Sequence, residues 1–222
     1  MSECDVVIPC RNEAPALPTL LARVPEGFRA IVVDNGSTDG TAEVARTAGA
    51  VVVSEPTLGY GAAVQAGVRA AASEHVAVID GDGSMDPGAL VGLLADVTDG
   101  GATMAVGRRR VVGSGVWPWH ARAGTALLAW VIRRRTRLAI HDLAPMRVCR
   151  RADLVALDVR DRRFGYPLEL MVRAARADWT VRERDIAYSS RAAGTRSKVS
   201  GSVRGTVLTI VDFAGVLREV GR

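Results

Sequence analysis

The sequence predicts an α/β fold in which helices flank a mainly parallel central sheet. Over the first hundred residues, short runs of β-branched residues alternate with stretches long enough to be crossover helices, a pattern typical of parallel sheets. The chain is 48% apolar and 24% charged, as globular proteins are, which excludes a disordered, collagen-like or coiled-coil protein. Its 222 residues suit one domain, 1–222, since domains of roughly 100 to 200 residues are the most common.

The expected elements follow from local composition and periodicity. In the first half, strands are predicted at 5–9, 29–34, 51–54 and 76–80, and helices at 17–23, 41–47 and 61–72. Asp86 is expected to cap a further helix, with Pro87 in its first position. In the second half, we expect amphipathic helical structure at 116–138, a strand at 146–149, a helix at 167–176, an edge strand at 179–188 and a last helix at 202–217.

The two halves of the chain carry opposite charge. Residues 1–107 contain 5 Arg and Lys against 14 Asp and Glu, whereas residues 108–222 contain 24 against 10. A charge asymmetry of this kind indicates an anionic partner for the basic half. Lys198 is the one lysine among the 29 basic residues, a bias that we attribute to a GC-rich genome. The arginines are therefore not taken as a sign of nucleic-acid binding.

The three cysteines, Cys4, Cys10 and Cys149, follow no metal-ligand spacing and are odd in number. Neither a disulfide framework nor a zinc site is expected, and a reducing cytoplasm suits the chain best. The sequence shows no signal peptide and no uncharged apolar run near the length of a membrane span. We expect a cytoplasmic protein, with peripheral contact at the inner face of the membrane left open.

Polar residues gather where three of the expected strands end. They are Pro9, Arg11, Asn12 and Glu13 after the first strand, Asp34 to Ser37 after the second, and Asp80 to Asp82 after the fourth. In open α/β sheets the ligand crevice lies outside the carboxyl ends of the strands. The three strand ends therefore predict one shared site.

Asp80 and Asp82 place two carboxylates in a tight turn after a buried strand. Mg²⁺ and Mn²⁺ prefer such oxygen ligands and commonly bridge protein carboxylates to phosphate oxygens. The alternative is a simple Asp-Gly turn. Asp34 ends another strand in an acceptor-rich turn, where a carboxylate can bind a base N–H or a ribose hydroxyl, or can belong to an ordinary loop.

Seven short motifs follow one another along nearly the whole chain. They are Ile8-Pro9-Cys10-Arg11-Asn12-Glu13, Val33-Asp34-Asn35-Gly36-Ser37-Thr38-Asp39, Gly59-Tyr60-Gly61-Ala62, Asp80-Gly81-Asp82, Asp142-Leu143-Ala144-Pro145-Met146-Arg147, Glu169-Leu170, and Arg191 through Arg196-Ser197-Lys198. In this set and order the chain resembles glycosyltransferase family 2, which has the GT-A nucleotide-sugar fold. Within that family it is most similar to the dolichol-phosphate mannose synthase-like subgroup.

The resemblance implies a donor site for a UDP- or GDP-sugar in residues 1–107. Asp34 with Glu13 would hold the base and ribose, and Asp82, aided by Asp80, would bind Mg²⁺ or Mn²⁺ on the diphosphate. Cations near the leaving diphosphate stabilise the charge that grows on it. The implied donor-site residues are Pro9, Asn12, Glu13, Asp34, Gly61, Asp80, Arg191, Arg196 and Lys198.

The same resemblance places Asp142 and Glu169 near the acceptor. An inverting transfer to a hydroxyl needs a general base, whereas a polyprenyl phosphate is already ionised and needs none. Glu169 can equally be an acid in the first turn of a helix, favourable at the helix dipole. Both acceptor classes stay open, with the lipid phosphate slightly ahead. Two departures from the family pattern bear on this choice, namely Asn35 in place of a second Asp and Ser84 in place of a Gln.

The basic half contains an aromatic segment at 116–138, with Trp117, Trp119 and Trp130 among arginines. Such a segment suits a helix lying on anionic lipid, and equally a helix packed on the sheet or in a homodimer interface. Two other classes are disfavoured. A sugar-nucleotide pyrophosphorylase would need an N-terminal glycine-rich loop with a lysine, which the sequence lacks, and a non-enzymatic adaptor would not need the acidic and basic motifs.

Overall fold

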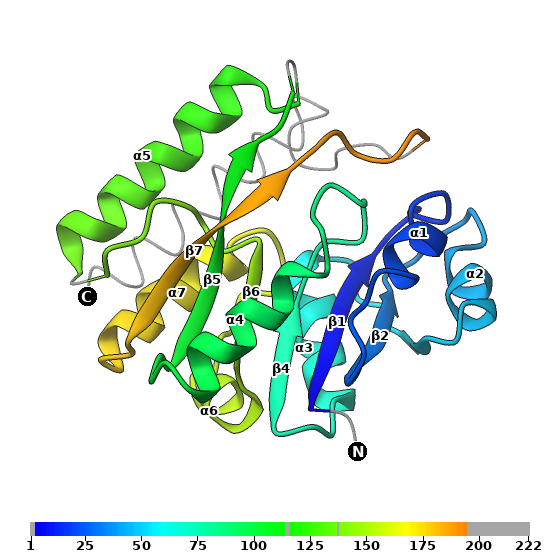
Figure 1. Ribbon diagram of the computed structural model, residues 1–222, viewed down its shortest axis with the longest axis horizontal. Helices are drawn as coiled ribbons and strands as arrows, with labels where there is room; N and C mark the ends of the chain where they lie inside the picture. Colours follow the sequence, from blue (N-terminus) through cyan, green and yellow to red (C-terminus); the bar gives the residue numbers. More distant parts are fainter. Residues whose placement is uncertain (1–2, 114–115, 137, 195–222) are drawn as a thin grey trace.

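Seven strands form one sheet in the order β3-β2-β1-β4-β6-β5-β7 (Figure 1). The computed structural model describes residues 3–113, 116–136 and 138–194. Neighbouring strands are parallel except where β6 is involved, because β6 runs antiparallel between β4 and β5. The strands are β1 (Cys4–Cys10), β2 (Phe28–Asp34), β3 (Val51–Ser54), β4 (His75–Val78), β5 (Met104–Val111), β6 (Met146–Arg150) and β7 (Val181–Tyr188).

Helices cover both faces of this sheet. In β1, Val7 packs into one core together with Ile31 and Val33, whereas Val6 and Ile8 point into the core on the other face. Helices α3, α6 and α7 contribute to the first core, and α1, α2 and α4 to the second. The helices are α1 (Leu17–Leu21), α2 (Thr41–Thr47), α3 (Tyr60–Ala70), α4 (Ala89–Thr98), α5 (Trp119–Arg135), α6 (Arg151–Ala156) and α7 (Tyr166–Arg176).

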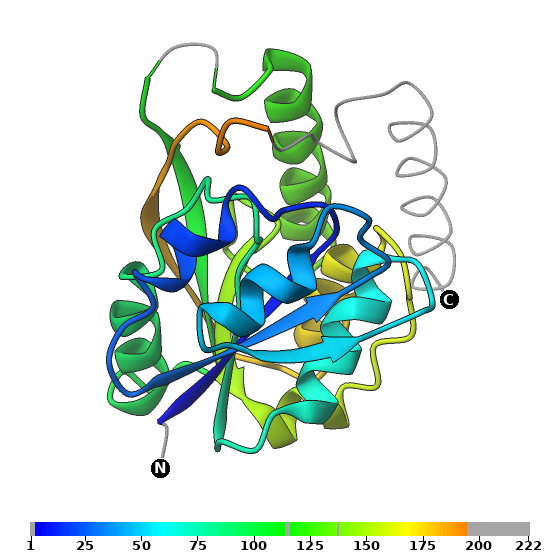
Figure 2. The same cartoon turned by 90° about the vertical axis from the view of Figure 1, so that its right-hand side faces the viewer.

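The longest of these helices, α5, lies at the edge of the molecule. Figure 1 shows it apart from the other labelled helices, beyond the strands β5 and β7, and in Figure 2 it is the green helix at the top of the view. Among its described side chains, Ala129 and Ile132 are the buried ones. The segment predicted at 116–138 is therefore one helix that touches the core along a narrow side.

The predicted fold class is confirmed, and most elements lie where the sequence places them. The strand at 51–54 and the helix at 41–47 have the predicted bounds. Strand β4 ends at Val78, two residues before Asp80, so that Asp80 and Asp82 lie in the loop that follows. Strand β5 and helix α6 were not among the predicted elements. The predicted boundary between the halves, at residue 107, falls inside β5.

The prediction for Asp86 is wrong in its position. Helix α4 begins at Ala89, with Gly88 as its N-cap residue. The Asp86 carboxylate instead accepts a hydrogen bond from the Gly88 N–H at 3.0 Å, which forms a turn ahead of the helix. The expected last helix at 202–217 lies outside the described residues.

Candidate active site

The carboxyl ends of β2, β1 and β4 lie side by side, in that order, in the sheet. Cys10, the last residue of β1, pairs with Asp34, the last residue of β2. Pro9 lies one residue earlier in β1, opposite Val33. The structure therefore brings the polar strand ends together at one edge of the sheet, as the sequence predicts.

Hydrogen bonds fasten the loop after β1 to the loop after β2 and to the first residue of α2. The Asn12 N–H donates to Ser37 Oγ at 3.0 Å, and the Thr38 N–H donates to Asn12 Oδ1 at 2.8 Å. The Glu13 N–H donates to Thr41 Oγ1 at 3.0 Å. Asn12 has a φ of 57°, a left-handed conformation that asparagine tolerates better than most residues. These contacts fix the position of Glu13, whose side chain is buried, at the start of the site.

Asp80 and Asp82 crowd each other in the turn after β4. Burial and the negative charge of Asp82 raise the pKa of Asp80 to about 6. Asp82 is buried, and its Oδ1 accepts the Ser84 N–H at 2.9 Å. Its Oδ2 lies 3.1 Å from Arg191 Nη1. Within the described residues, no group of three or more His, Cys, Asp or Glu side chains is arranged to hold a metal ion.

The segment after β7 is attached to this turn by its backbone. The Ser189 N–H and hydroxyl both donate to the Ser84 carbonyl, at 2.9 and 3.2 Å, and the Ala192 N–H donates to the Asp82 carbonyl at 3.0 Å. Arg191 is therefore held beside Asp82 by its neighbours as well as by charge. Arg196 and Lys198, which the sequence predicts to act with Arg191, lie outside the described residues.

Asp142 is bound to Arg109 of β5. Its Oδ2 accepts the Arg109 N–H at 3.0 Å and Nε at 2.9 Å, and its Oδ1 accepts Nη2 at 2.7 Å and the Leu143 N–H at 2.7 Å. The Asp142 side chain is 3% exposed and that of Arg109 is 16% exposed. The guanidinium also lies 3.9 Å from the ring centroid of Trp117. The carboxylate thus orients an arginine whose charge acts on Asp80.

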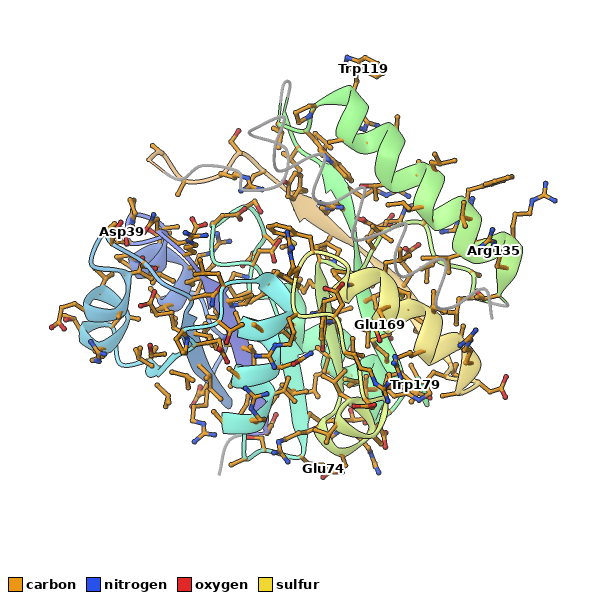
Figure 3. All side chains as sticks on the ribbon, turned by 180° about the vertical axis from the view of Figure 1, so that it is seen from behind. Asp39, Glu74, Trp119, Arg135, Glu169 and Trp179 are labelled. Atoms are coloured by element: carbon orange, nitrogen blue, oxygen red, sulfur yellow. The ribbon has the colours of Figure 1, made fainter. Side chains whose placement is uncertain are left out.

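Glu169 lies in the first turn of α7 and is buried inside the molecule (Figure 3). Its oxygens accept the Arg160 N–H at 3.1 Å, the Asp161 N–H at 2.6 Å and Arg173 Nε at 2.6 Å. The carboxylate therefore anchors the loop at 158–163 to the helix. The sequence leaves two roles open for Glu169, a catalytic base or an acid in the first turn of a helix, and its position in the structure is the second of these.

That loop packs against the start of α3. Its carbonyls at Arg163 and Arg162 accept the N–H groups of Gly61 and Ala62, at 3.1 and 2.8 Å. A Cβ atom on Gly59 or Gly61 would overlap the backbone carbonyl oxygens of Arg162 or Asp161. The two glycines are required for this close approach. The structure accordingly shows Gly61 donating to the protein backbone.

Comparisons with known proteins settle the family. Residues 5–152 match the family model of glycosyl transferase family 2, which is more than half of the chain. The chain belongs to glycosyl transferase family 2. It is 57% identical over 212 residues to an uncharacterised glycosyltransferase of Mycobacterium tuberculosis, with 96% of each chain covered. It is 33% identical over 219 residues to the polyprenol monophosphomannose synthase of Mycolicibacterium smegmatis, covering 89% of this chain and 81% of that one.

Solved structures of glycosyltransferases share the fold. A glucosyl-3-phosphoglycerate synthase from Mycobacterium tuberculosis, in complex with Mn²⁺, UDP and glucosyl-3-phosphoglycerate, superposes with a TM-score of 0.76 at 21% identity, over 99% of this chain and 80% of that one. The mannosyl-3-phosphoglycerate synthase from Rubrobacter xylanophilus gives 0.77 at 20% identity, over 99% and 75%. The protein is therefore a glycosyltransferase with the GT-A fold.

Two residues of this family 2 enzyme were not predicted as site residues. Asn35 donates its side-chain amide to the carbonyls of Glu55 and Thr57, both at 2.8 Å, and accepts the Gly59 N–H at 2.8 Å. An aspartate in this place could not donate to the two carbonyls. These hydrogen bonds give a physical reason for the asparagine at residue 35, where the family often has an aspartate. The signal in the sequence was this amide in place of the usual acid.

Arg147 of β6 is the second such residue. Its side chain is 1% exposed, Nη1 donates to the Ala144 carbonyl at 3.0 Å, and the guanidinium lies 5.3 Å from the ring centroid of Tyr166. Ala144 has a φ of 52°, so a strained backbone presents that carbonyl. The charge of Arg147, with those of Arg109 and Arg191, lowers the pKa of Asp80 against the effect of burial. An arginine between the apolar residues Met146 and Val148 of a buried strand is the sequence signal that marks it.

Proposed function

We propose that this family 2 glycosyltransferase moves a hexosyl group from a UDP- or GDP-sugar to a polyprenyl phosphate, with inversion at the anomeric carbon. One observation carries the choice of acceptor. Asp142 and Glu169, the carboxylates expected near the acceptor, are both engaged by an arginine and by backbone N–H groups. An ionised phosphate needs no base, whereas a hydroxyl acceptor gains roughly 10² to 10⁴ in rate from one.

Protonation of either carboxylate would break charge-assisted hydrogen bonds that hold the fold. Asp142 would lose one or more of its bonds to Arg109, and Glu169 would lose bonds to Arg173 or to the loop at 158–163. The contacts therefore favour positioning roles for both residues. Asp142 orients Arg109, and Glu169 orients the loop that supports the start of α3.

For the donor, we propose that Asp34 and Glu13 bind the base and ribose, with Pro9, Asn12 and Gly61 forming the surrounding wall. Asp34 Oδ1 accepts the Ser37 N–H at 3.1 Å, and the Asp34 side chain is half-buried at the strand end. A carboxylate with a second oxygen in this position suits a base N–H or a ribose hydroxyl.

We propose that Asp80 and Asp82 bind Mg²⁺ or Mn²⁺ together with the donor diphosphate. The donor set fits a hard divalent cation, since two carboxylates lie close enough for one charge to raise the pKa of the other. When bound, the cation would offset charge on the leaving diphosphate. Arg191, with Arg196 and Lys198 of the same basic stretch, would supply further positive charge to the phosphates.

The named relatives support this assignment. Besides the polyprenol monophosphomannose synthase, the chain is 31% identical over 195 residues to a dolichyl-phosphate hexose transferase of Haloferax volcanii. No helix among the described residues has the length and apolar character needed to cross a bilayer. We propose that the enzyme works from the cytoplasm in peripheral contact with the inner face of the membrane, as a monomer or homodimer, and without nucleic acid.

The test is transfer of radiolabelled sugar from UDP- and GDP-sugars to a membrane extract, followed by mild acid treatment of the product. We expect an organic-soluble, acid-labile polyprenyl phosphosugar. An acid-stable, water-soluble product would overturn the proposal in favour of a hydroxyl acceptor, with Asp142 or Glu169 as the base. Omission of the divalent cation is the control, and it should abolish transfer.

A further inference from the structure

One face of α5 presents large apolar side chains to solvent. Trp119 is 80% exposed, Leu127 is 60% exposed and Trp130 is 46% exposed. With two exposed alanines they recur every three or four residues, which is the spacing of one helix face. We call this face the apolar stripe, and its residues are Trp119, Ala123, Ala126, Leu127 and Trp130.

The charge on α5 is entirely positive. The helix contains no Asp or Glu, and it contains four arginines, at 122, 133, 134 and 135. Arg122, Arg134 and Arg135 are exposed beside the apolar stripe. The Arg134 guanidinium lies 5.3 Å from the ring centroid of Trp130, so cationic and aromatic groups share the same face. Figure 3 shows Trp119 and Arg135 on the outside of the molecule at opposite ends of the helix.

This combination matches a membrane surface. Tryptophan rings prefer the boundary between headgroups and acyl chains, and arginines beside them can bind lipid phosphates. Each basic residue close to an anionic membrane adds to the attraction. A protein partner that covered the stripe would have to supply an acidic rim as well. Anionic phospholipid provides both the apolar and the negatively charged surface.

The position of α5 connects this surface to the candidate active site. Strand β5 is parallel to β4, so its carboxyl end at Val111 lies at the same sheet edge as the donor residues. The chain then passes Trp117, whose ring contacts Arg109, and enters α5 at Trp119. A membrane under α5 would therefore border the edge of the sheet that holds Asp80 and Asp82.

We propose that α5 lies in the headgroup layer of an anionic phospholipid bilayer, with the apolar stripe toward the acyl chains and Arg122, Arg134 and Arg135 on lipid phosphates. The proposal rests on the proposed lipid-phosphate acceptor, because a polyprenyl chain stays in the bilayer while its phosphate must reach the sheet edge. Docking through α5 would bring the two together.

The test is sedimentation of the full chain with vesicles of phosphatidylglycerol and phosphatidylcholine in equal parts, compared with phosphatidylcholine alone. We expect binding to the anionic vesicles, with a blue-shifted tryptophan emission. The double variant Trp119→Ser/Trp130→Ser should weaken vesicle binding by about tenfold or more, since burial of apolar area drives interfacial helices. Arg134→Gln should weaken it less. Val91→Ser on α4, which removes a side chain that is 53% exposed, is the matched control and should bind as the natural chain does.

The same variants separate this proposal from the proposed function. Transfer to a short, water-soluble polyprenyl phosphate should be unchanged in the double variant, whereas transfer to acceptor embedded in vesicles should fall. If the natural chain binds the anionic vesicles but transfers sugar to no lipid phosphate, the acceptor assignment is overturned and the role of α5 is not. Equal vesicle binding by the natural chain and by the double variant would overturn the role of α5. A natural chain that is dimeric by light scattering, and monomeric as the double variant, would assign the stripe to a second copy instead.

Discussion

Two pairs of carboxylates in this enzyme lie in different electrostatic surroundings. Asp80 and Asp82 share one turn, and the charge of Asp82 helps to raise the pKa of Asp80 to about 6. Asp142 and Glu169 each lie against an arginine and accept backbone N–H groups. Asp80 and Asp82 still repel each other although Arg191 lies 3.1 Å from Asp82, whereas Asp142 and Glu169 each hold an arginine. On this ground we propose that Asp80 and Asp82 bind ligand, whereas Asp142 and Glu169 stabilise the structure.

The largest expected effect comes from the crowded pair. Asp82→Ala should reduce sugar transfer by about 10² or more, because the cation that we propose to offset charge on the diphosphate would lose a ligand. Binding of nucleoside diphosphate, measured by calorimetry with Mn²⁺ and with EDTA, should lose its dependence on the metal. Asp99→Ala, which removes an exposed carboxylate at the end of α4, is the control and should behave as the natural enzyme. Full activity of Asp82→Ala would remove the metal from the proposal.

Substitutions of the carboxylates that pair with arginine, Asp142 and Glu169, should lower the free energy of unfolding. Asp142→Asn leaves the largely buried Arg109 without its carboxylate, and breaking a buried ion pair costs about 3 kcal/mol or more. Urea unfolding measures the loss, and the double variant Asp142→Asn/Arg109→Gln should recover part of it. A normal unfolding midpoint together with a lost acid limb in the pH profile of kcat would instead identify Asp142 as a base.

Asn35→Asp tests how much the Asn35 amide stabilises the backbone at Glu55, Thr57 and Gly59, and its expected effect on stability is smaller. The aspartate would face the carbonyls of Glu55 and Thr57 without a donor, a cost of about 1 to 3 kcal/mol in the free energy of unfolding. Asn35→Ala removes the amide without adding charge and should lose less stability. Equal stability of the natural chain and Asn35→Asp would show that the amide donors contribute nothing.

The smallest expected effect is one of pH. The folded-state pKa of Asp80, about 6, lies above the ordinary value of 3.8, so the folded protein holds this proton where the unfolded chain has lost it. Stability from the protonated form is therefore lost as the pH rises through about 6. Affinity for Mn²⁺ with nucleotide should rise over the same interval, by about tenfold per pH unit below the pKa. Calorimetry in several buffers should detect proton release on binding, and a pH-independent affinity would contradict the assignment of Asp80.

The meeting of the polar strand ends at one edge of the sheet could be predicted from the sequence. Asp34 and Asp80 follow short buried runs, and parallel strands place their carboxyl ends at one edge. The partners of Asp142 and Glu169 could not be predicted in the same way. Arg109 is 33 residues from Asp142, and Asp142 meets it only because β6 enters the sheet next to β5.

Arg147 shows the same limit. Its neighbours Tyr60 and Tyr166 come from α3 and α7, and no local pattern brings the two rings to one strand.

The incorrect prediction of Asp86 as a helix cap has a different origin. Its carboxylate satisfies a turn N–H at Gly88 just as well as a helix N–H, so the same residue preference serves two local structures.

The placement of β6 also bears on how the chain assembles during synthesis. Among the described strands, β5 pairs with β6 and β7 and with none of β1 to β4. If strands pair as they emerge, a nascent chain that ends at β5 would hold a β3-β2-β1-β4 layer with an uncovered β4 edge, and an unattached β5. Some 35 more residues must leave the ribosome before β6 can cover that edge and recruit β5. Until then the β4 edge offers open backbone groups to other chains, so chaperone capture and aggregation would concentrate on this one stage of translation.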